Sequence, residues 1–364
     1  MQGENKAESE ISRRYFCMGS VIVAAGIASG GMLAGCGKVA TAPQPKSPEI
    51  KIKTVDVHSH IIPPEYTEAV RKAGVANEDG FPAPEWNLEE HLNFMDQAEI
   101  ELSILSLSSP HQNFGNNEES RVLSRRINET TAAIKQKYPK RFGFNAVLPL
   151  PDVEGSLEEI THAFDVLKAD GIKLSSNSRG VYLGDPLFEP IFAELNKRNA
   201  VVNIHPCKPS AVPANVFTSG LLPLFEFIAD TTRAVINLIT SGTITRYPNV
   251  KIVVPHCGSF LPGLVERLAG ITEILTAQGV GKPVNVMDSV KMLYFDIAGT
   301  PLPRNFDTLL TMVDPSKVMY GSDYPFTPAP AIIANKKAIM AYEPIDKYKA
   351  MIFRENALQL FKRL

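Results

Sequence analysis

Residues 55–60 read Val-Asp-Val-His-Ser-His, an apolar strand pattern that delivers two histidines with one residue between them. Side chains alternate between the two faces of a β-strand, so His58 and His60 project to the same side. Two imidazoles on one side can bind one cation, and histidine is the commonest metal ligand in proteins. Taken alone, the pair could equally be two loop histidines without a ligand, so the rest of the chain must supply the argument.

Three later β-rich runs end in the same way, with a polar side chain directly after an apolar strand. They cover residues 201–206, 252–258 and 318–325. Their polar ends are His205, His256 and Asp323. His205 alone fits a core histidine that is hydrogen-bonded to a backbone carbonyl. However, four of the seven histidines and one aspartate lie at strand ends, and core packing alone does not produce that coincidence.

Short β-rich runs alternate with longer helical patterns, which is typical of βαβ units around a parallel sheet. The β-rich runs cover residues 50–57, 101–107, 142–148, 171–174, 200–204, 250–254, 292–297 and 317–320. Helices are expected, for example, over residues 88–99, 118–137, 157–168 and 347–361. An open doubly wound sheet is the alternative to a closed barrel. Only a barrel makes the first and eighth strands neighbours, so that all the polar strand ends meet. We therefore predict an α/β fold, a (β/α)₈ barrel with a metal site at the C-terminal face of its strands.

The chemistry of these side chains limits which metal ions the site can bind. Three neutral imidazoles, or two with a carboxylate, suit zinc, and a carboxylate also admits manganese or iron. We expect one divalent metal, Zn²⁺ in the first place and Mn²⁺ as the alternative. His256 is either a further imidazole ligand or a base beside the metal, and Asp323 can both bind the metal and move a proton. The remaining histidines lie in helical or loop contexts and are interpreted as structural or solvated: His91, His111 and His162.

The beginning of the chain has the layout of an export signal. Two adjacent arginines at positions 13–14 precede an apolar run over 21–33, which is short for a membrane-spanning helix. The arginine pair resembles a twin-arginine signal. The run ends in Leu-Ala-Gly-Cys at residues 33–36, which resembles the lipobox of bacterial lipoproteins. The alternative is an ordinary signal peptide in which Cys36 is incidental.

We divide the chain accordingly into three parts. A signal covers residues 1–35, a proline-containing tether covers 36–49, and a barrel domain covers 50–364. The predicted location is the periplasm or cell envelope, with membrane contact only through a lipid anchor on Cys36.

Composition and charge exclude several classes of protein. Hydrophobic residues make up 44% and charged residues 21%, which is typical of a globular protein. The formal net charge is −2 and no basic run follows residue 14, so we expect no nucleic-acid partner. Four cysteines are too few for a disulfide scaffold in 364 residues. Cys207 and Cys257 are interpreted as small buried thiols.

Together these motifs make the chain similar to the amidohydrolase superfamily. More narrowly, it resembles the decarboxylase branch that includes the aminocarboxymuconate-semialdehyde, 6-methylsalicylate and γ-resorcylate decarboxylases. The resemblance covers about residues 50–364. The segments that carry it are 58–60, 205–206, 232–248, 256–262, 320–326 and 355–361.

The resemblance implies roles for individual residues. The implied metal ligands are His58, His60, His205 and Asp323. By the same resemblance, His256 lies beside the metal and acts on water or substrate. Arg267 follows on the next helix, and in relatives an arginine there binds a substrate carboxylate in the neighbouring subunit. A homodimer is therefore implied, and the alternative for Arg267 is a surface or salt-bridging residue.

The function implied is non-oxidative decarboxylation of a small aromatic or dienoic carboxylate. One departure from the wider superfamily is Lys173, because many of its hydrolases use a modified lysine after the fourth strand to bridge two metals. Here we interpret Lys173 as structural or supporting. The alternatives are a metal-dependent hydrolase of a lactone, amide or ester, and a lipoprotein that binds a ligand without catalysis. An aromatic pocket around Trp86 and Phe326 is a weaker expectation than simple packing.

Overall fold

A computed structural model of the protein describes residues 52–216 and 220–362. Its main sheet has eight strands in the order β1-β2-β3-β4-β7-β8-β9-β10, and neighbours in this order run parallel. The strands are β1 (Thr54–His60), β2 (Ile100–Ser106), β3 (Phe142–Val147), β4 (Gly171–Ser175), β7 (Val201–His205), β8 (Lys251–Val254), β9 (Tyr294–Asp296) and β10 (Val318–Met319). The predicted (β/α)₈ class is confirmed, whereas the predicted signal and tether lie outside the described residues.

The two ends of the sheet meet and close the barrel. The backbone N–H of Val57 donates to the carbonyl of Tyr320 at 3.0 Å, just past β10. Further along, the N–H of His60 donates to the carbonyl of Tyr324 at 2.7 Å. Closure places the end of the first strand beside the segment that follows the last, as the sequence analysis required.

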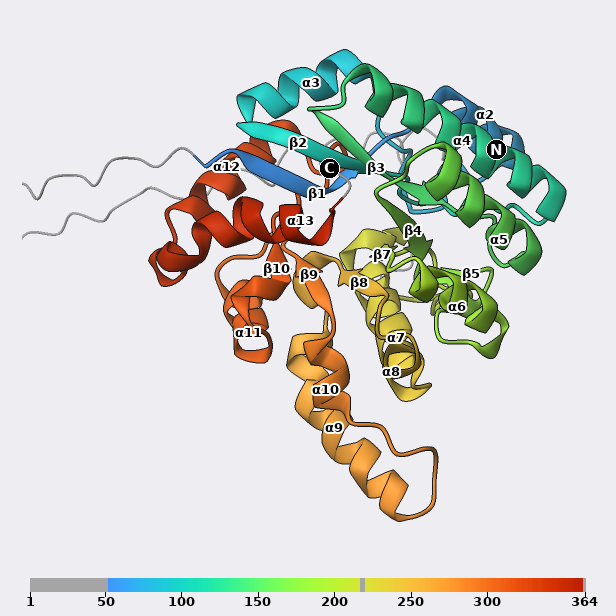
Figure 1. The fold of residues 1–364 in the computed structure, drawn as a ribbon, viewed down its shortest axis with the longest axis vertical. Coiled ribbons are helices and arrows are strands. Elements are labelled where there is room, and N and C mark those ends of the chain that lie inside the picture. The colour runs from blue at the N-terminus through green and yellow to red at the C-terminus, as the bar shows by residue number, and fades with distance from the viewer. Residues whose placement is uncertain (1–51, 217–219, 363–364) are drawn as a thin grey trace, which may run out of the picture. The chain divides into compact units, whose positions relative to one another are not determined.

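Helices surround the strands (Figure 1). They are α2 (Pro64–Ala73), α3 (Leu88–Gln97), α4 (Asn117–Lys137), α5 (Val153–Thr161), α6 (Glu189–Lys197), α7 (Glu226–Thr240), α8 (Thr243–Arg246), α9 (Leu261–Ala277), α10 (Val286–Lys291), α11 (Arg304–Met312), α12 (Ala329–Met340) and α13 (Asn356–Leu360). A short hairpin, β5 (Asn177–Ser178) and β6 (Val181–Tyr182), follows β4. Within the described ranges, no helix combines the length and apolarity needed to cross a membrane.

Several element boundaries differ from the expectation. β1 continues to His60 because it pairs with β2 as far as Ser106, so the two histidines lie within the strand. The helix expected over 157–168 begins at Val153 instead, where the side chain of Asp152 caps it by accepting the N–H of Gly155. The helix expected over 347–361 is divided into three short elements, Glu343–Tyr348, Met351–Glu355 and Asn356–Leu360.

The apolar residues of the strands form two clusters. On β8, Ile252 and Val254 belong to the larger cluster, which also holds helix residues, while Val253 belongs to the smaller one. The smaller cluster draws on strands from opposite sides of the barrel, including Leu102 on β2 and Val253 on β8, and therefore fills its interior. Alternation along the strands thus explains why their sequences are almost continuously apolar.

Candidate metal centre and cavity

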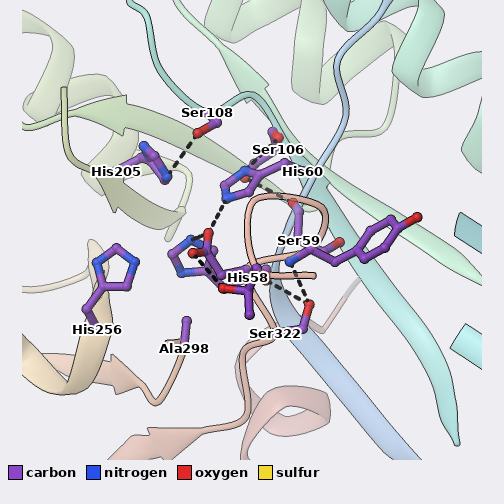
Figure 2. A network of polar contacts seen from close by, with 12 residues as sticks. His58, Ser59, His60, Ser106, Ser108, His205, His256, Ala298 and Ser322 are labelled. Atoms are coloured by element: carbon purple, nitrogen blue, oxygen red, sulfur yellow. Dashed lines mark hydrogen bonds and ion pairs between the residues drawn. The ribbon is translucent and has the colours of Figure 1, made fainter. Parts of the chain in front are cut away.

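Three imidazoles, two from β1 and one from β7, meet at the C-terminal ends of the strands (Figure 2). The ring centroids of His58 and His60 are 5.0 Å apart, and those of His60 and His205 are 4.8 Å apart. With Asp323 they form a group, called here the His/Asp group, in which one ligand atom of each residue lies within 4.8 Å of the others. The structure therefore brings together all four residues that the sequence predicted as metal ligands.

Hydrogen bonds fix the orientation of two of these imidazoles. Nδ1 of His60 lies 3.2 Å from the carbonyl oxygen of Ser106. Nδ1 of His205 lies 2.8 Å from the carbonyl oxygen of Pro206. A carbonyl oxygen only accepts, so Nδ1 carries a hydrogen in both rings, and Nε2 is the nitrogen left to face a ligand; in His60 it lies 3.0 Å from Oδ1 of Asp323. This arrangement leaves Nε2 as the ligand atom, as is usual for metal-binding histidines.

The surroundings of the third imidazole, that of His58, favour a positive charge at this site. Nε2 of His58 is buried, has no hydrogen-bond partner among the described residues, and lies 3.5 Å from Oδ1 of Asp323. Burial lowers the pKa of His58, but Asp296 and Asp323 outweigh it and raise the value to about 9. A divalent cation among three Nε2 atoms and one carboxylate would supply this positive charge. The donor set therefore fits zinc or manganese.

Asp296 is a functional residue that the sequence analysis missed. It ends β9, is 1% exposed, and its Oδ2 lies 2.8 Å from Nδ1 of His58. Its Oδ1 accepts the backbone N–H groups of His256 at 3.1 Å and Ala298 at 3.0 Å. The available signal was a carboxylate at the end of the strand expected over 292–297, the same pattern that identified the other site residues.

His256 lies beside the His/Asp group without being part of it. Its ring centroid is 5.1 Å from that of His58 and 6.4 Å from that of His205. Burial, together with His58, lowers the pKa of His256, so its imidazole is neutral at neutral pH. Its Nδ1 is buried and has no hydrogen-bond partner within the described ranges. This position suits an acid–base residue next to a metal better than a further ligand.

The segments after β8 and β10 hold an unusual backbone conformation. Four non-glycine residues there have positive φ: His256 (55°), Cys257 (54°), Ser259 (58°) and Asp323 (63°). Each such residue costs about 1–3 kcal/mol, and such outliers concentrate at functional sites. The surrounding structure therefore holds His256 and Asp323 in place although a non-glycine backbone disfavours positive φ.

A cavity of about 440 Å³ opens beside the His/Asp group. His205, His256 and Asp323 contribute to its lining, and so does a second carboxyl group, Asp79. The aromatic lining residues are Phe81, Phe227, Phe260 and Phe326. In the described part of the chain, no lysine or arginine lines it. Its size and aromatic walls suit a small aromatic molecule.

A larger hollow of about 660 Å³ lies at the N-terminal ends of β7, β8 and β9. None of the predicted site residues lines it. Because His205, His256 and Asp323 all line the smaller cavity, we place the chemistry there.

Lys173 and the two described cysteines take no part in the His/Asp group. Lys173 is buried, and its Nζ donates to the carbonyl of Ser108 at 3.3 Å and to Oγ of Ser175 at 2.8 Å. These hydrogen bonds agree with the supporting role predicted for it. Cys207 and Cys257 are buried free thiols, as predicted.

The three histidines that the sequence left outside the site are also outside it in the structure. His91 is buried and accepts the indole N–H of Trp86 at 3.0 Å. His111 lies 3.0 Å from Oγ of Ser178. Trp86 packs against the core and does not line the cavity, whereas Phe326 does, so one of the two predicted aromatic residues is found there.

Arg267 lies exposed on α9 and does not line the cavity of its own chain. Figure 1 shows α9 and α10 extending away from the strands. The outer surface of α9 exposes several apolar side chains: Leu264, Ile271, Ile274 and Leu275. A role for Arg267 in a neighbouring subunit therefore stays a prediction.

Comparisons with known proteins agree with this geometry. A family model described as amidohydrolase matches residues 55–363. The 6-methylsalicylic acid decarboxylase of Penicillium expansum is 34% identical over 315 residues, which are 85% of this chain and 96% of that protein.

Solved structures with the same fold include metal complexes. One structure described as an amidohydrolase is 36% identical, covers 85% of this chain and 99% of its own, and superimposes with a TM-score of 0.80. The 5-carboxyvanillate decarboxylase of Novosphingobium aromaticivorans, complexed with manganese and 4-hydroxy-3-methoxy-5-nitrobenzoic acid, gives a TM-score of 0.78. It is 25% identical, and the match covers 85% of this chain and 96% of that one.

Proposed function

The chain belongs to the amidohydrolase family, and from that membership we propose that it is a metal-dependent, non-oxidative decarboxylase of a small aromatic carboxylic acid. The observation that carries the proposal is the His/Asp group beside an aromatic-lined cavity of about 440 Å³. The relative from Penicillium expansum is named for 6-methylsalicylic acid, a substrate of this size. The enzyme class is accordingly a carboxy-lyase.

The reaction replaces a carboxylate by a hydrogen atom. The bond between the ring carbon and the carboxylate breaks, carbon dioxide leaves, and the ring carbon takes up one proton. No net oxidation occurs, so no redox cofactor is required. The protein has to hold the acid, place a proton beside the ring carbon, and stabilise the charge that develops.

The residues that would hold the cation are those of the His/Asp group. When bound, the cation supplies Lewis-acid chemistry, which attracts a carboxylate or phenolate oxygen of the substrate and stabilises negative charge. We favour zinc because of the three imidazoles, with manganese as the alternative because the 5-carboxyvanillate decarboxylase holds it. Asp296 keeps His58 in the required tautomer.

Proton transfer falls to Asp323 and His256. Burial raises the pKa of Asp323, but the hydrogen bond with His60 and the neighbouring imidazoles lower it to about 2. Asp323 is therefore ionised and accepts a proton from an acid or hydroxyl group of the substrate, which it can pass to the ring carbon. His256 is neutral and lines the same cavity, where it can exchange a proton with the reacting carbon.

The test is direct incubation of zinc- or manganese-loaded protein with 6-methylsalicylate and related hydroxybenzoates. Release of carbon dioxide and of the matching phenol in equal amounts is the expected result. A His58→Ala variant serves as the metal-site control. Turnover of lactones or esters without any release of carbon dioxide from the acids would favour the hydrolase alternative instead.

Location and assembly complete the proposal. We propose export through the twin-arginine-like leader, attachment by a lipid on Cys36, and a homodimer in which Arg267 faces the partner's cavity. The support is the order of leader motifs in the sequence and the exposed position of Arg267. Metabolic labelling with palmitate in the presence and absence of Cys36→Ser tests the anchor. Sedimentation of the purified protein tests the dimer.

A further inference from the structure

The cavity contains one carboxyl group that the proposed mechanism does not use. Asp79 lies in the loop between α2 and α3, is 6% exposed, and lines the cavity together with Asp323 and His205. Its Oδ1 accepts the hydroxyl hydrogen of Ser109 at 3.0 Å. Among the described residues, no donor reaches its Oδ2. This Oδ2 is not fully enclosed by protein, so a donor on a ligand in the cavity can reach it.

The hydrogen bond with Ser109 fixes where Asp79 stands relative to the metal site. Ser109 directly follows Ser108, whose Oγ lies 3.4 Å from Nε2 of His205. Figure 2 shows Ser108 beside His205 at the edge of the group. Asp79 therefore belongs to the cavity wall at the end of β2. An aromatic ring held at the His/Asp group would turn one of its edges toward this wall.

Among the described residues, no lysine or arginine lines the cavity beside Asp79, although the charges of Lys208 and Lys173 act on it from outside the cavity. The nearby Lys208 lies 3.4 Å from Glu78, and Lys173 donates to serine oxygens. Burial raises the pKa of Asp79 to about 6, so the group is mostly ionised at pH 7.5. A buried carboxylate is stabilised by a hydrogen-bond donor and destabilised by a second negative charge.

We propose that Asp79 is a specificity-determining residue that selects aromatic acids with a hydrogen-bond donor, such as a second hydroxyl group, on the ring edge facing β2. By the same charge, Asp79 rejects acids that carry a second carboxylate at that edge. The inference rests on the proposed function, because it assumes that an aromatic acid occupies the cavity. It adds to that function the chemical class of substituent that the site accepts.

The experiment compares ligands that differ in one substituent. The reference acid is 2-hydroxybenzoate, and the series adds a second hydroxyl, or a second carboxylate, at each remaining ring position. Dissociation constants and kcat/KM are measured for the metal-loaded wild-type protein, for Asp79→Leu and for Asp79→Asn. Glu78→Gln is the matched control, since Glu78 is the adjacent carboxylate and does not line the cavity.

The wild-type protein is expected to prefer one dihydroxy acid over the reference about tenfold or more, the usual effect of a hydrogen bond to a charged group. Asp79→Leu should bring this ratio close to one. Asp79→Asn should improve binding of the matching dicarboxylate about tenfold, because its amide can donate to the second carboxylate. Glu78→Gln should keep both ratios within about twofold.

Three results would overturn the inference. They are a wild-type protein without preference in the series, a preference that Asp79→Leu leaves intact, and an equal loss for all acids, which would indicate a purely structural role. Failure of the proposed function looks different: the acids would bind with an Asp79-dependent preference, and none would be decarboxylated.

Discussion

The carboxylate of Asp296 lies 2.8 Å from Nδ1 of His58, although 238 positions separate the two residues in sequence. The other oxygen of the same carboxylate accepts the backbone N–H of His256. One side chain therefore orients a predicted metal ligand and, through the backbone, a predicted acid–base residue. It also supplies negative charge that favours a cation at the opposite nitrogen of His58.

Replacing Asp296 should weaken metal binding without removing a ligand. In Asp296→Asn the amide presents either a weaker acceptor or a donor to Nδ1, and the donor would force the wrong tautomer of His58. We expect a 10- to 100-fold loss of affinity for the cation, the usual effect of removing such a partner. Competition with a chromophoric chelator measures it. Asp288→Asn, at an exposed carboxylate 3.0 Å from Lys291, is the control, and equal affinity in the two variants would contradict the role.

Removing a ligand should abolish stoichiometric metal binding. In His205→Ala only two imidazoles and one carboxylate remain, and elemental analysis should find little metal after gel filtration. The wild-type protein should also lose thermal stability after chelation, because a ligand present at 1,000 times its dissociation constant stabilises by about 4 kcal/mol. Calorimetry should show that added metal restores the wild-type protein but not the variant. A chelated protein with an unchanged unfolding temperature would argue against a structural contribution of the metal.

His256→Ala should separate proton transfer from metal binding. The imidazole lies outside the His/Asp group, so the metal content should stay near that of the wild-type protein. We expect kcat to fall about 100- to 10,000-fold, the range for loss of a general acid or base. Loss of metal in this variant would show instead that His256 is a ligand. His162→Ala, at a histidine outside the cavity, is the matched control.

Gly321→Ala should disturb the site through packing alone. A Cβ atom at position 321 would lie 2.7 Å from Cβ of His58, so that either the strand or the segment after β10 must move. We expect a loss of about 1–3 kcal/mol in the free energy of unfolding, together with weaker metal binding. On α9, Gly263→Ala meets nothing within 4 Å, so it should leave metal binding unchanged and raise the free energy of unfolding by up to about 1 kcal/mol. Denaturant titration and chelator competition test the pair.

Lys336 predicts a pH dependence of stability. Its Nζ donates to the carbonyl of Glu99 at 3.1 Å, and burial lowers its pKa from 10.5 to about 8. Between these values the unfolded chain binds more protons than the folded one, so stability rises with pH. Relative to Lys336→Met, the wild-type protein should gain about 2–3 kcal/mol from pH 8 to pH 10.5, and should lose this gain again as pH falls from 10.5 to 8. Lys337→Met, at an exposed neighbour, is the matched control.

The pattern of apolar runs that end in polar residues was sufficient to predict most of the residues of the site. His58, His60, His205 and Asp323 each follow an apolar run, and parallel strands in a barrel bring their C-terminal ends together. The strand pattern also predicted where the chain crosses the sheet, with errors of a few residues. Those errors arose where a capping side chain, as at Asp152, or the pairing partner set the boundary.

The sequence by itself determined the class of fold and the ligand types, because periodic burial and the polar residues at strand ends are local properties. The tertiary structure decided which groups act on those ligands. Asp296 reaches His58, and Ser109 reaches Asp79, through hydrogen bonds that no spacing in the sequence encodes. Such contacts depend on the closure of the barrel and on the conformation of the loops above it. The tautomers of the site histidines, the preference of the site for a cation and the proposed selectivity of the cavity therefore follow only from the folded chain.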